Sequence, residues 1–224
     1  MKIGIPLYNV GGLRMSGRGR SLYENADEIR KRIRDRYKID GNEKVILYVG
    51  AEQPRKNLDT LIKAFYKLKK KMPETRLIKI GPPYWKGARK KLLDLILSLN
   101  LQKDVIFINF VPEEDLPIFY NIADLFVLPS YYEGFGQPPL EAMACGCPII
   151  TTNKSSIPEV VGDAAIKLDN PFDVKLLSKT MEEVLTNEGL RKDMIKEGLK
   201  QAKTFSWEKY ADDVYEIYKE VYEK

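Results

Sequence analysis

The chain has 224 residues, of which 44% are hydrophobic and 31% charged, and its formal net charge is +5. This length suits one sizeable α/β domain, and no apolar run approaches the roughly 20 residues that a membrane-spanning helix needs. The sequence opens without a signal-peptide pattern, and Cys145 and Cys147 lie too close together to suggest a disulfide framework. We therefore expect a cytoplasmic globular protein whose two thiols are buried and reduced.

The N-terminal part of the chain differs from the rest. "MKIGIPLYNVGG" is typical of a strand followed by a glycine loop, whereas "LRMSGRGRS" behind it has no apolar period. A helix with Ile29 and Ile33 on one face then leads into the first clear strand. We expect residues 1–23 to form a mobile extension and residues 24–224 to form the compact domain.

Short apolar runs alternate with amphipathic stretches over the rest of the sequence. Each run ends at a glycine, a proline or a polar turn, which is typical of a buried parallel strand. The strands are expected at 44–50, 76–81, 105–110, 125–130, 148–153 and 164–168. Helices are expected at 57–71, 86–99, 114–122, 139–145, 173–187, 190–203 and from Ser206 onward. This alternation predicts an α/β fold with a Rossmann-like, doubly wound parallel sheet of about six strands in a single domain.

Aromatic and aliphatic residues recur at helical spacing in the final segment. The stripe consists of Trp207, Tyr210, Val214, Ile217, Tyr218 and Val221. Such a stripe is far more often a packing surface than a ligand site. We interpret it as a contact with the core.

Lysines gather at positions 67, 69, 70 and 71. A solvated helix face is the favoured interpretation of this cluster. The weaker alternative is attraction to an anionic lipid surface, which would make the protein peripheral to a membrane. We expect no nucleic-acid partner. Abundant lysine and glutamate with few glutamines also resembles the surface of a thermophile's protein.

The loop after the first strand, "GAEQPRKN" at residues 50–57, carries two adjacent cations. Ligands of open α/β sheets bind at the carboxyl ends of the strands. Gly50 lets the chain turn, and Arg55 and Lys56 stand beside the start of the next helix, where they would suit a diphosphate. An ordinary solvated turn is the alternative.

The loop after the fourth strand reads "EGFGQPPLE" at residues 133–141. It fails the dinucleotide pattern G-x-G-x-x-G because Pro139 stands where the third glycine should be. A helix is expected to begin at Pro138 or Pro139, which puts Glu141 in the first turn. There its carboxylate could accept hydrogen bonds from ribose hydroxyls, or merely complement the helix dipole.

Glu133 precedes the turn of this loop and is expected on its concave side. Glycine allows a close approach between backbone and ligand. Backbone N–H groups are therefore expected to face a ligand at Gly134, Phe135, Gly136 and Gln137.

The longer stretch "SYYEGFGQPPLEAMACGCPIITTN" resembles the signature of family-four retaining glycosyltransferases, whose GT-B architecture has two facing Rossmann-like domains. The resemblance continues in "YVGAEQPRKNLDTLIKAF", "INFVPEEDLPIFYNIADLFVLPS" and "SSIPEVVGDAAIKLD" and covers roughly residues 43–215. It implies the C-terminal, donor-binding half of an enzyme that transfers a hexose, such as mannose or glucose, from a nucleotide diphosphate sugar to a glycan or lipid-linked acceptor in polysaccharide biosynthesis.

The resemblance also implies roles for individual residues. Arg55 and Lys56 would hold the diphosphate, Glu141 would bind the ribose, and Glu133 would act at the transferred hexose beside the reaction centre. Main-chain groups from Asn109 to Val111 would meet the base, with Val111 beneath it.

Three positions depart from the family pattern. Ala51 replaces a frequent arginine and removes one phosphate contact, while Asn109 replaces the usual glycine and Gln137 the usual aliphatic residue. The chain contains no Asp-x-Asp pair for a metal-bound diphosphate. We therefore expect no metal and no cofactor, with arginine, lysine and a helix dipole offsetting the charge of the leaving group.

Only "MKIGIPLYNVGG" resembles the acceptor-binding domain of the family. We expect residues 1–224 by themselves to bind the sugar donor but to transfer sugar slowly or not at all, because closure of two domains positions the acceptor. One alternative is a non-catalytic nucleotide-sugar-binding module, or a subunit completed by a separate acceptor-domain chain. An NAD-dependent oxidoreductase is disfavoured because no G-x-G-x-x-G follows the first strand.

Overall fold

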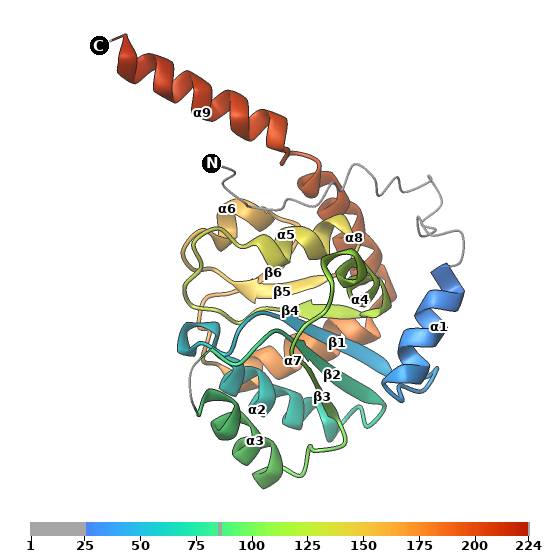
Figure 1. The fold of residues 1–224 in the computed structure, drawn as a ribbon. Coiled ribbons are helices and arrows are strands. Elements are labelled where there is room, and N and C mark those ends of the chain that lie inside the picture. The colour runs from blue at the N-terminus through green and yellow to red at the C-terminus, as the bar shows by residue number, and fades with distance from the viewer. Residues whose placement is uncertain (1–25, 85–86, 224) are drawn as a thin grey trace.

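A six-stranded parallel sheet with the order β3-β2-β1-β4-β5-β6 runs through the protein (Figure 1). The computed structural model describes residues 26–84 and 87–223. The strands are β1 (Lys44–Val49), β2 (Thr75–Ile80), β3 (Val105–Ile108), β4 (Leu125–Val127), β5 (Ile149–Thr152) and β6 (Ile166–Leu168). The predicted Rossmann-like, doubly wound sheet in a single domain is confirmed. The predicted extension, residues 1–23, lies outside the described residues.

The first three strands end level with one another. β1 has the sequence KVILYV, and its four central residues are buried because helices cover both faces of the sheet. In the register of the ladder, Val49 pairs with Ile80, and Ile80 pairs with Ile108. The loops after these strands therefore begin at one edge of the sheet.

Helices cover the sheet in two layers. α2 packs on α3 and α7 on one face, while α5 packs on α4, α6 and α8 on the other, with α1 against α4 (Figure 1). The α-helices are α1 (Ala26–Arg36), α2 (Leu58–Lys69), α3 (Ala88–Ser98), α4 (Leu116–Ile122), α5 (Gln137–Ala144), α6 (Ile157–Val161), α7 (Val174–Thr186), α8 (Glu188–Ala202) and α9 (Trp207–Tyr222). Short 3-10 helices are η2 (Pro54–Lys56) and η3 (Glu113–Asp115). Sequence reasoning missed α6, since five residues are too few to show a helical period.

The strand order creates a topological switch point between β1 and β4. The chain passes from β1 to β2 and β3 in one direction, then returns to place β4 on the other side of β1. Open α/β sheets bind ligands at such a point, outside the carboxyl ends of the strands. The loops after β1 and β4 therefore flank the expected binding crevice.

The predicted core contact of α9 is wrong. Ser206 caps this helix as expected, with its hydroxyl accepting from the Lys209 N–H, but no residue of α9 is buried, and Tyr218 is 72% exposed. Figure 1 shows α9 projecting away from the sheet. Helical spacing reveals that a helix has an apolar face, but it does not reveal where the partner of that face lies.

The lysine cluster is partly neutralised by neighbours. Lys69 pairs with Asp104 at 2.9 Å, Lys71 pairs with Glu182 at 2.6 Å, and Lys70 lies over the Tyr66 ring, 4.3 Å from its centre. The cluster is thus not a bare cationic patch. In the described part of the chain, no helix has the length and apolarity needed to cross a bilayer.

Both cysteines are free thiols, as predicted. Cys147 is buried, whereas Cys145 is only partly buried. Burial nevertheless raises the pKa of the Cys145 thiol to about 12, and the nearby Glu141 carboxylate raises it further. Neither environment favours a reactive thiolate.

Candidate functional site

Two cations from the loop after β1 meet one carboxylate from the loop after β4. Arg55 Nη1 lies 3.0 Å from Glu133 Oε2, and Lys56 Nζ lies 2.7 Å from Oε1 and 2.9 Å from Oε2. Lys56 and Glu133 are each only 7% exposed, although 77 residues separate them in the sequence. Two positive charges and one negative charge leave this cluster with an excess of one positive charge.

Backbone contacts lock the two loops together. The Tyr131 N–H donates to the Arg55 carbonyl at 3.0 Å, and Arg55 Nη1 donates back to the Tyr132 carbonyl at 2.8 Å. Arg55 is therefore held by its main chain and its side chain. These contacts fix the position of its guanidinium.

Two serines that sequence reasoning overlooked support Glu133. The Glu133 N–H donates to Ser155 Oγ at 2.9 Å. The Ser156 hydroxyl lies 3.0 Å from the Glu133 carbonyl and 2.9 Å from the Phe135 carbonyl. Their only signal was the pair of small polar residues before "IPEVV", where a helix could start.

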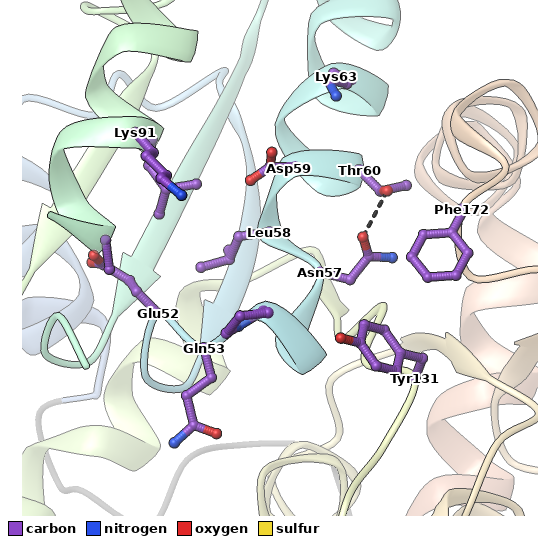
Figure 2. Close-up of a pocket in the computed structure, with 13 residues that line it drawn as sticks. Glu52, Gln53, Asn57, Leu58, Asp59, Thr60, Lys63, Lys91, Tyr131 and Phe172 are labelled. Atoms are coloured by element: carbon purple, nitrogen blue, oxygen red, sulfur yellow. Dashed lines mark hydrogen bonds between the residues drawn. The ribbon is translucent and has the colours of Figure 1, made fainter. Parts of the chain in front are cut away.

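Asn57 joins the β1 loop to two other segments. It adopts the left-handed conformation with φ of 54°, which asparagine tolerates better than most residues. Its Nδ2 donates to the carbonyls of Pro129 and Pro171 at 3.2 and 2.6 Å. Figure 2 shows its third hydrogen bond, in which Oδ1 accepts from the Thr60 hydroxyl at 2.8 Å. The pocket in Figure 2 opens beside Asn57 and Tyr131, and none of Arg55, Lys56 and Glu133 lines it.

Glu141 lies in a different environment from the one expected. α5 begins at Gln137, so Glu141 is its fifth residue and the prediction of a first-turn position is wrong. The boundary shifts because Gly136, with φ of 105°, serves as the N-cap and Pro138 follows within the first turn. Glu141 Oε2 accepts a hydrogen bond from the Tyr120 hydroxyl at 2.8 Å.

Burial controls the ionisation of Glu141. Loss of solvation raises the pKa of this carboxyl to about 7, and the Glu113 charge adds to that effect, while hydrogen bonds from Tyr120 and Gln137 oppose it. The carboxyl is therefore poised between its neutral and charged forms near neutral pH. Sequence reasoning had no signal for Tyr120, which belongs to α4.

Residues 134–137 form a glycine-containing loop between Glu133 and Glu141. A side chain at Gly134 would meet no heavy atom within 4 Å, so the chain is open there. Phe135 is half exposed, with its ring edge-on to Phe205. Pro138 and Pro139 carry no N–H. The groups able to donate to an anion here are thus concentrated between Gly134 and Gln137.

Asn109 and Val111 follow the end of β3, two strands away from β1. Asn109 is exposed and Val111 is partly buried against the core. Asn109 Oδ1 accepts a hydrogen bond from Arg89 Nη2 at 2.9 Å. The sequence-predicted residues therefore spread along one edge of the sheet, from β3 to β4, rather than in a single cluster.

A buried ionic network lies beneath this edge. Glu52 Oε1 accepts from Lys79 Nζ at 2.7 Å and from Arg89 Nε at 2.6 Å. Both Glu52 and Lys79 are nearly inaccessible to solvent, and burial lowers the pKa of Lys79. Sequence reasoning missed this network because its three members come from separate segments without a shared motif.

Comparison with known proteins assigns the family. Residues 29–201 match the family described as glycosyl transferases, group 1. The chain is 40% identical to O-antigen chain mannosyltransferase B of Escherichia coli over 177 residues, which are 77% of this chain and 45% of that protein. The chain thus spans less than half the length of this curated relative.

Solved structures have the same fold. The C-terminal domain of a group 1 glycosyltransferase from Francisella tularensis is 26% identical, with a TM-score of 0.69, and the match covers 81% of this chain and 93% of that domain. The Anabaena protein HepE, solved in complex with UDP and glucose, gives a TM-score of 0.80 at 19% identity, covering 95% of this chain and 55% of that one. The chain belongs to the group 1 family of glycosyltransferases.

Proposed function

We propose that this domain binds a nucleotide diphosphate sugar and acts as the donor half of a retaining hexosyltransferase of the family-four type. The observation that carries the proposal is the meeting of Arg55, Lys56 and Glu133 at the switch point between β1 and β4. Cations at this place suit a diphosphate, because arginine and lysine bind phosphate oxygens through charge-assisted hydrogen bonds.

The charge of the cluster suggests how the diphosphate binds. Glu133 neutralises part of the charge of Arg55 and Lys56. A diphosphate carries more negative charge than one carboxylate, so it competes for the same two cations. Glu133 would then be released to accept hydrogen bonds from hydroxyls of the hexose.

Transfer would break the bond between the anomeric carbon and the diphosphate oxygen and form a bond from that carbon to the acceptor oxygen. The nucleoside diphosphate leaves with the electron pair of the broken bond, and its departing oxygen takes up the proton that the acceptor hydroxyl loses. Arg55, Lys56 and the N–H groups of residues 134–137 would stabilise the charge on the leaving diphosphate. We propose that no metal ion or cofactor is needed for this step.

The relatives favour particular sugars and acceptors. The name of O-antigen chain mannosyltransferase B supports mannose as the sugar and a glycan chain as the acceptor. The Anabaena structure with UDP and glucose supports a nucleotide sugar as donor. We propose a hexose, with mannose as the first candidate, and a cytoplasmic site of action.

The acceptor would bind to a second domain. The match covers nearly all of the solved C-terminal domain from Francisella but less than half of the curated mannosyltransferase. We infer that residues 26–223 correspond to the C-terminal half and that a further domain, in the same polypeptide or in a partner chain, supplies the acceptor site. The alternative function is a module that binds the nucleotide sugar without turnover.

Calorimetric titration with nucleosides and nucleoside diphosphates tests the proposal. Arg55→Ala should weaken binding of the diphosphate by about 1.5 to 3 kcal/mol and leave nucleoside binding unchanged, since one charge-assisted contact is lost. Lys67→Ala, an exposed lysine at the other end of α2, serves as the control. Equal losses for both ligands would refute the assignment, and a loss of binding on addition of EDTA would refute its metal-free form.

A further inference from the structure

Three contacts fix the guanidinium of Arg89. Its Nε donates to Glu52 Oε1 at 2.6 Å, and its Cζ lies over the Phe107 ring, 4.4 Å from the ring centre. The third contact is the hydrogen bond from Nη2 to Asn109 Oδ1 at 2.9 Å. Because Glu52 is buried and also paired with Lys79, this arrangement has little freedom to change.

Arg89 thereby decides which end of the Asn109 amide faces outward. A guanidinium has only hydrogen-bond donors, so it must face the amide oxygen rather than the amide nitrogen. The amide oxygen of Asn109 is consequently engaged, and its Nδ2 group remains the part that can reach a ligand. Asn109 is exposed at the end of β3, so a ligand at this edge of the sheet can contact it.

Two glycines lie along the sheet edge between Asn109 and the cation cluster. Gly50 and Gly81 directly follow β1 and β2, and the Gly81 N–H donates to the Ile108 carbonyl at 2.8 Å. A side chain at Gly81 would come within 2.4 Å of the Gly50 carbonyl oxygen. The two glycines keep this stretch of the edge free of side chains of their own, so that a nucleoside can lie across it with its base near Asn109.

We propose that Arg89 orients Asn109 as a hydrogen-bond donor to the base, so that the site selects nucleotides whose base presents a carbonyl oxygen over those that present an amino group. Guanine carries this oxygen at position 6 and uracil at position 4. At the same positions, adenine and cytosine carry an amino group. This inference rests on the proposed function, and it assigns base preference to a side chain that replaces the usual glycine of the family.

Calorimetric titration with ADP, CDP, GDP and UDP tests the inference within each ring size. GDP should bind about tenfold more tightly than ADP, and UDP about tenfold more tightly than CDP, because an amino group facing another donor leaves both unpaired. Affinities within threefold in both pairs would overturn this inference and leave the proposed function standing. Failure of all four nucleotides to bind would overturn both.

Two variants assign the preference to named side chains. Asn109→Asp can only accept when ionised, so it should reverse the preference toward ADP and CDP, whereas Asn100→Asp, the same change at an exposed site after α3, should not alter it. Arg89→Met, which removes the donor that holds the Asn109 amide oxygen, should reduce each ratio toward one without weakening the binding of inorganic pyrophosphate. An unchanged GDP to ADP ratio in Asn109→Asp would overturn the proposal.

Discussion

The stretch from residue 133 to residue 141 has a glutamate at each end, and the two side chains lie in contrasting environments. Glu133, on the β4 loop, accepts hydrogen bonds from both Arg55 and Lys56. Glu141, on α5, has a tyrosine hydroxyl as its neighbour, and loss of solvation raises its pKa to about 7. The carboxylate of Glu133 is paired with cations, whereas that of Glu141 is held by neutral donors.

The difference shows that the ionisation of a buried glutamate depends on which neighbouring groups offset the loss of solvation of its carboxylate. Arg55 and Lys56 compensate the charge of Glu133 directly, so we expect the proposed diphosphate, by competing for these cations, to change the surroundings of this carboxylate. Hydrogen bonds from neutral groups only partly offset the loss of solvation of Glu141. Its charge therefore changes with pH near neutrality. We expect the two ends of the stretch to respond to different perturbations, and the following four predictions test that.

The largest effect is expected when Glu133 loses its buried cation. Lys56→Met should lower the free energy of unfolding at pH 7 by about 3 kcal/mol, because a buried carboxylate is left with one partner. Arg55→Met should cost less than about 1 kcal/mol, since Arg55 is 35% exposed. Urea denaturation measures both values. Adding Glu133→Gln to Lys56→Met should restore part of the loss, and strict additivity would contradict the pairing.

The second effect concerns stability and pH at Glu141. The pKa of Glu141 is raised from 4.5 to about 7 in the folded protein. Below pH 4.5 the carboxyl is mainly neutral in both states, so its burial does not lower the free energy of unfolding. As pH rises from 4.5 through about 7, the free energy of unfolding decreases. Relative to Glu141→Gln, the wild type should therefore lose on the order of 2 kcal/mol between pH 4.5 and pH 8. The chain contains no histidine, which removes the side chain that usually titrates in this range. A constant difference between the two proteins across this range would rule the prediction out.

The third effect links the charge of Glu141 to the ribose. If the carboxylate accepts from the ribose hydroxyls, the preference for a ribonucleotide over its 2′-deoxy counterpart should grow by about 1.5 kcal/mol as pH rises through 7. In Glu141→Gln the preference should stay flat with pH. Calorimetry at pH 6 and pH 8 measures both, and parallel behaviour of the two proteins would remove Glu141 from the ribose site.

The smallest effect is expected at Tyr120. Its hydroxyl favours the charged form of Glu141, so Tyr120→Phe should raise the pKa of that carboxyl above its value of about 7. The midpoint of the titration of Glu141 should move upward by up to about one pH unit. Carboxyl NMR chemical shifts measure the midpoint, with Tyr132→Phe, an exposed tyrosine, as the control. A downward shift would contradict the role of Tyr120.

Local sequence patterns predicted most of the fold and part of the site. The apolar runs identified all six strands of the described sheet, because a strand buried on both faces needs a continuous apolar segment. Local patterns also placed Gly50, Arg55 and Lys56 correctly in the loop after the first strand, since a strand, a turn and a helix start follow each other along the chain. The position of Glu141 in its helix was wrong by one or two residues, because the helix starts at Gln137, before the two prolines.

The sequence by itself determined which residues form strands and helices and which loops carry glycines, cations and carboxylates, because these features depend on neighbours along the chain. Only the tertiary structure decided that Glu133 pairs with Lys56, that burial raises the pKa of Glu141, that Arg89 faces Asn109, and that α9 is exposed. Pairing, desolvation and coverage depend on distances between segments far apart in the sequence, and no local pattern encodes those distances.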